Sequence, residues 1–228
     1  TASNNTAVGY NCLDANTTGA NNTSVGEASM SDNTDGSNNC GFGVMSMLRN
    51  TTADNNTAFG YSSLKETTTG QQNVAVGSEA LDANTTASNN TAVGFQAMKS
   101  NTTGTVNVAV GNHALDANTT ANFNTAIGGY ALGANTTGTQ NTAVGASALL
   151  SNTTGVYNTA VGYVALDACT TGDQNTAVGR AALSGATTAD NNTAIGFKAG
   201  DAISTGTRNT LVGSQAGLSF NNDDNTNF

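Results

Sequence analysis

The sequence has few basic residues and few charged residues of any kind. Among 228 residues it contains 6 Lys plus Arg against 15 Asp plus Glu, which gives a formal net charge of -9. Such a chain has no basic stripe that could neutralise the phosphates of a nucleic acid or the headgroups of an anionic membrane. It also has no apolar run long enough to span a bilayer. We therefore expect no nucleic-acid partner and no membrane insertion by this segment.

The residue types on which most enzymes depend are also scarce. His113 is the single histidine, and the residues that recur at its position elsewhere are varied and mostly polar, which favours a solvent-facing substitution over a general base. The three cysteines lack zinc-type spacing, and Cys12 and Cys40 are expected to lie too far apart for a disulfide. A recurrent Asp position is interrupted by Lys65 and Lys99, whereas a calcium-binding repeat needs acidic pairs in every turn. We predict no enzymatic activity, no metal site and no cofactor.

Large hydrophobic residues are scarce too, and Asn, Thr, Ala and Gly dominate, a composition that without a period would indicate disorder. The chain instead repeats one 17-residue phrase thirteen times without insertion, as in Asn141–Tyr157. We number its positions from 1, the first Asn, to 17. An unbroken period near 20 residues is typical of stacked repeats. It predicts an all-β fold, a parallel β-solenoid (β-roll) of about 13 turns, and a single uncapped domain over residues 1–228 that belongs to a longer fibre or assembly.

Two positions hold the same residue in every repeat and predict where the backbone bends. Position 1 is always Asn and position 5 is always Gly. Gly accepts positive φ or close backbone approach, and Asn tolerates the left-handed region and hydrogen-bonds locally. We interpret both positions as corners, which include Asn5, Gly9, Asn73, Gly77, Asn107, Gly111, Asn141 and Gly145.

Alternation between the corners assigns an inner and an outer face. Position 4 is Val, Ile or Phe and position 2 is Thr or Val in nearly every repeat, so both are predicted to point inward. Position 3, most often Ala, is then predicted to face outward against a neighbouring chain. Position 9, Leu or Met in most repeats, is predicted to point inward from a second strand. The predicted core comprises Val8, Leu13, Val76, Leu81, Val110, Leu115, Val144, Leu149, Val161 and Leu166.

The phrase Asn-Thr-Ala-Val-Gly-x-x-Ala resembles the Asn-Ser-Val-Ala-Ile-Gly-x-x-Ser phrase of YadA-type trimeric adhesin heads, and Asn73–Gly77 and Asn107–Gly111 are its closest copies. The longer phrase with Asn-Thr-Thr-Gly is similar to repeats in bacterial surface proteins and phage tail fibres. The resemblance covers the whole chain. It implies a left-handed parallel β-roll, a homotrimer with chains side by side, and an adhesive or fibre role at a cell surface or on a virion, outside the cell.

Several features of the surface suggest what the repeats present to a partner. Aromatic residues at position 6 could stack on a sugar ring of an unidentified surface receptor or glycan, or could cover gaps between chains. They are Tyr10, Tyr61, Phe95, Tyr163 and Phe197.

Two alternative functions also fit the repeat. Asn and Thr at positions 12 and 14 are predicted to alternate outward, as in Asn84 with Thr86 and Asn118 with Thr120, and such a ladder is what ice-binding solenoids present. The open ends could instead stack on other copies, end to end, in an extracellular filament. We favour a non-enzymatic structural and adhesive rod that serves as spacer and attachment surface.

Overall fold

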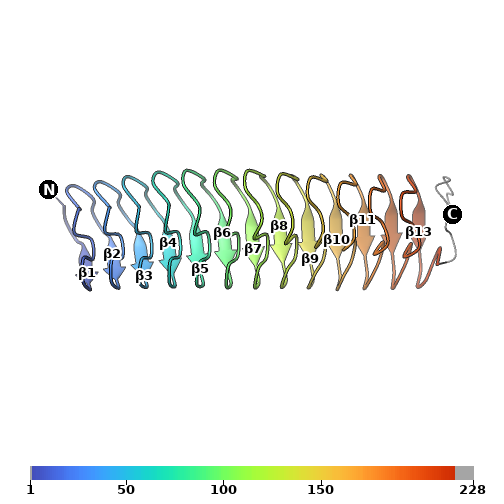
Figure 1. The fold of residues 1–228 in the computed structure, drawn as a ribbon, viewed down its shortest axis with the longest axis horizontal. Coiled ribbons are helices and arrows are strands. Elements are labelled where there is room, and N and C mark those ends of the chain that lie inside the picture. The colour runs from blue at the N-terminus through green and yellow to red at the C-terminus, as the bar shows by residue number, and fades with distance from the viewer. Residues whose placement is uncertain (1, 219–228) are drawn as a thin grey trace. The chain divides into compact units, whose positions relative to one another are not determined.

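The computed structural model, which describes residues 2–218, is an all-β parallel solenoid with one three-residue strand in each 17-residue coil (Figure 1). This confirms the predicted fold class. The coils fall into two compact units, Thr1–His113 and Ala114–Phe228, and each is described by itself. Unit 1 contains β1 (Thr6–Val8), β2 (Thr23–Val25), β3 (Cys40–Phe42), β4 (Thr57–Phe59), β5 (Val74–Val76), β6 (Thr91–Val93) and β7 (Val108–Val110). Unit 2 contains β8 (Thr125–Ile127), β9 (Thr142–Val144), β10 (Thr159–Val161), β11 (Thr176–Val178), β12 (Thr193–Ile195) and β13 (Thr210–Val212).

Within each unit the strands pair in parallel and in sequence order, so that each residue lies beside the same repeat position in the next coil. Ala143 of β9, for example, lies between Ala126 of β8 and Ala160 of β10. The backbone ladder continues past the strand ends, because the Thr142 amide donates to the Asn158 carbonyl at 2.8 Å. Identical residues are therefore stacked at the strand spacing of about 4.8 Å.

The strands face the opposite way from the prediction. Position 3 points inward, since Ala143 and Ala160 are fully buried. Position 4 points outward: Val8, Val76 and Val110 are 58%, 37% and 36% exposed. The remaining members of the predicted valine core, Val144 and Val161, are half-buried.

The width of the coil explains this inversion. Position 3 packs in the same narrow interior as the buried position 8, which is Ala148 in this coil, so small side chains fit there, and the larger Leu211 is buried beside Gly200, where position 9 has no side chain. Alternation with a period of two does not show whether position 3 or position 4 faces inward. The prediction chose position 4 because its residues are apolar, and this choice was wrong. The small Ala column therefore gives no evidence for a neighbouring chain.

The leucine column does form the core. Leu81, Leu115, Leu149 and Leu166 are fully buried, and Leu13 in the first coil is 9% exposed.

The second strand predicted around the leucine column is absent from the described residues 2–218, where turns occupy that half of the coil. Wherever the structure describes them, positions 7, 9 and 17 adopt left-handed backbone, as in Ser147 at φ 55°, Leu149 at φ 52° and Tyr157 at φ 60°. Left-handed geometry costs a non-glycine residue about 1–2 kcal/mol. The stacked neighbours must offset this cost, because all of these residues except Gly200 and Gly217 carry a Cβ.

Asparagine at position 1 is bonded through both ends of its side chain, to the next coil through Oδ1 and to position 15 of its own coil through Nδ2. The Asn158 Oδ1 accepts the backbone N–H of Asn175 at 2.9 Å, and its Nδ2 donates to the Gly172 carbonyl at 2.7 Å. The residues of this column are buried from the second coil onward. Asn5, Asn73, Asn107 and Asn141 occupy the same position, so the predicted corner is a hydrogen-bonded ladder inside the solenoid.

Glycine at position 5 makes the other corner. Gly145 has φ +136°, and a Cβ built on it would lie 2.5 Å from the carbonyl oxygen of Gly162 in the next coil. Gly9, Gly77 and Gly111 have φ values of 142°, 136° and 141°. A residue without Cβ is required here because the backbones of successive coils meet.

Candidate functional surfaces

Four columns of side chains face outward, form three surfaces and are the candidates for function. Positions 2 and 4 form the sheet face, the outer side of the strands. Position 6 is the aromatic column, which follows the Gly corner. Position 14 forms the Thr ridge at the far turn, where Thr86, Thr120 and Thr154 are exposed.

The predicted aromatic residues are all exposed. Tyr10, Tyr61, Phe95, Tyr163 and Phe197 are between 38% and 74% accessible to solvent. Tyr61 and Phe95 lie two coils apart in unit 1, and Tyr163 and Phe197 lie two coils apart in unit 2, because each pair is separated by 34 residues. Two coils correspond to about 9.6 Å. Each unit thus holds one pair of exposed aromatic rings at the same separation.

Other exposed aromatic residues stand outside the predicted column. Tyr130 at position 7 and Phe123 and Tyr157 at position 17 are exposed, each on left-handed backbone. The sequence offers no signal for Tyr130, because position 7 varies among polar, apolar and charged residues. Phe42 and Phe59 stack on the sheet face of unit 1 with centroids 4.9 Å apart.

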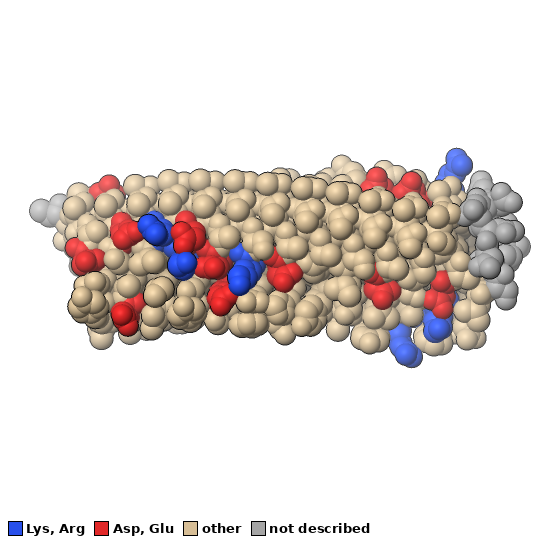
Figure 2. Space-filling model, viewed as in Figure 1, with Lys and Arg blue, Asp and Glu red and all other residues tan. Residues whose placement is uncertain are grey.

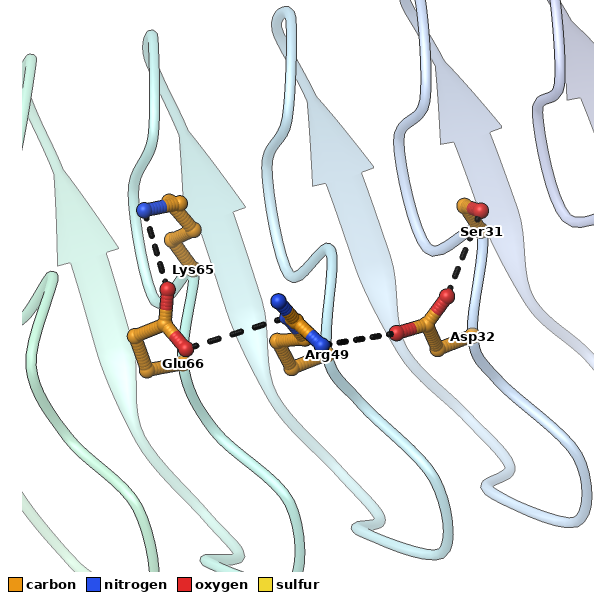
Figure 3. Close-up of polar contacts among 5 residues, drawn as sticks. All are labelled: Ser31, Asp32, Arg49, Lys65 and Glu66. Carbon is orange, nitrogen blue, oxygen red and sulfur yellow. Dashed lines mark hydrogen bonds and ion pairs between the residues drawn. The ribbon is translucent and has the colours of Figure 1, made fainter.

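Charged side chains of unit 1 gather in a band of alternating sign (Figure 2). Arg49 lies between Asp32 at 3.9 Å and Glu66 at 3.8 Å, and Lys65 contacts Glu66 at 2.9 Å (Figure 3). Lys65 and Glu66 are adjacent in one coil, whereas Asp32 and Arg49 come from the two preceding coils. These pairs are exposed or half-exposed and contribute little to stability. They neutralise one another and leave no strong local charge for a ligand.

The titratable groups of the described residues do not converge on a catalytic arrangement. Burial raises the pKa of Asp82 and of Asp167, two aspartates at position 10 of different units. Hydrogen bonding from Lys99 lowers the pKa of Glu79. The His113 and Phe95 rings form a T-shaped pair with centroids 5.4 Å apart. Among residues 2–218 no group of three or more His, Cys, Asp or Glu side chains could hold a metal ion.

The cysteines are free thiols in the described chain. Cys169 replaces Asn at position 12 and is fully buried, and burial raises its pKa to about 11. Cys40 replaces Thr on the sheet face, where burial also raises its pKa. A raised pKa suppresses the nucleophilic thiolate, so neither cysteine is suited to covalent catalysis near neutral pH.

Only the Thr members of the predicted Asn-x-Thr ladder lie at the surface. Asn84 and Asn118 are fully buried, and Asn16 in the first coil is half-buried. The position 12 amide bonds along the stack, as where Asn152 Nδ2 donates to Asn135 Oδ1 at 2.7 Å. The left-handed residue at position 9 changes the phase of the turn, so that position 12 points inward. The prediction that Asn and Thr alternate outward at positions 12 and 14 is therefore wrong for Asn.

In comparisons with known proteins, no family model, no curated protein and no solved structure matches the chain. The fold and the exposed columns together define the class of protein, a parallel β-solenoid with one strand per coil. Within residues 2–218 there is no helix with the length and apolar character needed to cross a membrane.

Proposed function

We propose that the chain is a non-enzymatic structural and adhesive element of a fibre outside the cell, at a cell surface or on a virion. The observation that carries the proposal is the exposed aromatic column on a scaffold of repeated coils. Each coil places its position 6 side chain directly after the Gly corner. The scaffold therefore sets the spacing between aromatic rings, while the residue type at position 6 can differ from coil to coil. This arrangement suits attachment to a receptor or glycan.

The fold supplies the stiffness that a spacer needs. The position 1 Asn column and the backbone ladder join every coil to the next inside each unit, and position 12 amides add further bonds between coils where Asn occupies that position. Each added repeat would extend the spacer by one strand spacing, about 4.8 Å.

Association of three copies is a proposal that rests on the resemblance to trimeric adhesin heads. The thin core also favours association, since it buries little apolar surface for 17 ordered residues. Light scattering at micromolar concentration tests it, and the mass of one chain would count against it.

The attachment role is tested with beads that carry the protein and are washed over glycan arrays and cell surfaces. The variant with Tyr61→Ser, Phe95→Ser, Tyr163→Ser and Phe197→Ser is expected to lose most of the retention seen with the wild type. The matched control replaces exposed threonines of the Thr ridge, Thr154→Ser and Thr188→Ser. Equal retention of both variants, or no retention of the wild type on any surface, would reject attachment through the aromatic column.

A further inference from the structure

The sheet face of unit 2 is a two-column array without interruption. Position 2 is Thr in all six strands and position 4 is Val or Ile in all six, so the face contains no charge, no aromatic ring and no glycine. The array comprises Thr125, Thr142, Thr159, Thr176, Thr193 and Thr210 beside Ile127, Val144, Val161, Val178, Ile195 and Val212. Unit 1 differs, because Cys40, Val74 and Val108 break its Thr column and Phe42 and Phe59 break its aliphatic column.

The hydroxyls of this array have no partner in the described part of the protein. In another Thr column, at position 13, the hydroxyls bond to backbone carbonyls of the next coil: the Thr153 Oγ1 donates to the Thr170 carbonyl at 3.0 Å. Among residues 2–218 no hydrogen bond involves the hydroxyl of any of the six sheet-face threonines of unit 2. Because a hydroxyl offers one donor and two acceptor sites, these groups must bond to solvent.

The array is also rigid and regular. Thr, Val and Ile branch at Cβ and have restricted side-chain rotamers, so each position presents its methyl and hydroxyl groups in a narrow range of directions. The strands are in register from β8 to β13 and repeat at about 4.8 Å, and the two columns lie about 7 Å apart along each strand. Water above such a face would bond to the hydroxyls and be restricted in orientation between the methyl groups. The face is therefore suited to ordering water at a fixed two-dimensional repeat.

We propose that the sheet face of unit 2 binds ice through this ordered water. The spacings of the array along and across the strands are close to repeats found on the surface of hexagonal ice, and ice is an uncharged partner that offers hydrogen bonds at regular intervals. Both properties match a face of hydroxyl and methyl groups that carries no charge in a chain of net charge -9.

A second copy of the chain fits this face less well than ice does. Dry packing of two such faces would bury the threonine hydroxyls and satisfy them only if they paired across the interface in register, a requirement that opposes association. An ice surface satisfies the same hydroxyls and also covers the methyl groups. The face is separate from the aromatic column, so this inference goes beyond the attachment role.

The test measures ice shaping and the thermal hysteresis gap of the full chain and of three variants with matched size changes. Thr159→Tyr places a bulky ring at the centre of the unit 2 face. Thr154→Tyr places the same ring on the Thr ridge, and Thr91→Tyr places it on the interrupted face of unit 1. The wild type is expected to shape ice, and Thr159→Tyr is expected to reduce the gap several-fold while the two controls keep most of it.

Each variant is checked by circular dichroism and thermal unfolding, and Thr176→Lys replaces Thr159→Tyr if the latter does not fold. Absence of ice shaping by the wild type, or equal effects of Thr159→Tyr and Thr154→Tyr, would overturn the proposal. Light scattering on the same samples tests whether a second copy of the chain occupies the face instead. The proposal is wrong, and the face is an interface between copies, if the wild type is an oligomer that does not shape ice and Thr159→Tyr lowers its mass. Bead retention through the aromatic column is measured separately and can succeed or fail independently.

Discussion

The buried leucine column shows how far a single residue can depart from its usual backbone preference. Leu149 is fully buried with φ 52°, and the Leu or Met at position 9 of each of the first eleven coils has the same left-handed geometry. A bulky residue avoids this region in isolation. In the solenoid the Leu149 amide donates to the Ala165 carbonyl of the next coil at 3.0 Å, and its side chain fills the core. Burial and the axial hydrogen bond together hold the residue in place.

The position 1 asparagine is expected to be the most sensitive polar residue. Asn158→Ala leaves the Asn175 amide and the Gly172 carbonyl buried without the partners that they have in the wild type. We expect the free energy of unfolding to fall by about 2–4 kcal/mol, since each orphaned buried group costs about 1–3 kcal/mol. Urea unfolding followed by circular dichroism measures the change.

Thr154→Ala is the control for this substitution, because its side chain is exposed on the Thr ridge. A surface change of this kind is expected to cost no more than about 0.5 kcal/mol. Similar midpoints for Asn158→Ala and Thr154→Ala would show that the asparagine ladder does not stabilise the coil.

At the scale of the coil, the fixed glycine determines whether neighbouring turns can approach. Gly145→Ala would bring a Cβ to 2.5 Å from the Gly162 carbonyl oxygen and to 2.6 Å from its carbon, on backbone at φ +136°. We expect a loss of at least about 3 kcal/mol in unfolding free energy, because both strain and overlap must be relieved. Chemical denaturation of the purified protein measures it.

Gly155→Ala provides the comparison within the same coil. Position 15 is Gly there but Ala at Ala53, Ala87, Ala121 and Ala189, and its backbone is not in the positive-φ region. A Cβ on Gly155 would overlap the Gly172 carbonyl oxygen, as the Cβ of Ala does in the coils that carry Ala at this position, but it would add no positive-φ strain. The substitution is therefore expected to cost less than Gly145→Ala. A larger loss at Gly155 would contradict the role assigned to the position 5 corner.

The coil also shows what the sequence could and could not predict. The period, the parallel stacking and the two corners follow from residues that recur without exception, such as Asn141 and Gly145. The facing of β9 does not, because Thr142-Ala-Val144 alternates equally well in either direction and the choice depends on the width of the coil. The turn at Ser147 and Leu149 could not be foreseen, because neither residue type signals left-handed backbone. Because of these two errors, the prediction placed the regular exposed array on the Asn-x-Thr residues of positions 12 to 14. The structure places it on the Thr-x-Val residues of positions 2 to 4.

At the scale of the whole chain, stability is expected to depend on register rather than on length. Nearest-neighbour contacts between identical coils make each repeat an interchangeable part. Deletion of residues 142–158 removes one complete coil and joins Asn141 to Thr159, so that every column continues. We expect this variant to fold, with a far-ultraviolet circular dichroism spectrum like that of the wild type and a midpoint within a few degrees of it.

Deletion of residues 142–149 removes less chain but shifts every later column by eight positions. Charged and polar residues would then stack on core positions, and we expect unit 2 to lose its cooperative unfolding transition. If the 17-residue deletion were the more damaging of the two, coil stacking would not be the source of stability.

The left-handed residues at positions 7 and 17 have a further consequence for how such a chain can change. Their bends are enforced by the hydrogen bonds of neighbouring coils, so the side chains that they carry contribute little to folding and can be Tyr, Lys, Glu or Val. New surface side chains can therefore be introduced at positions 7 and 17 of one coil at a time, while the chain lengthens or shortens by whole coils. The length of the solenoid and the residues that it presents to a partner can thus evolve independently.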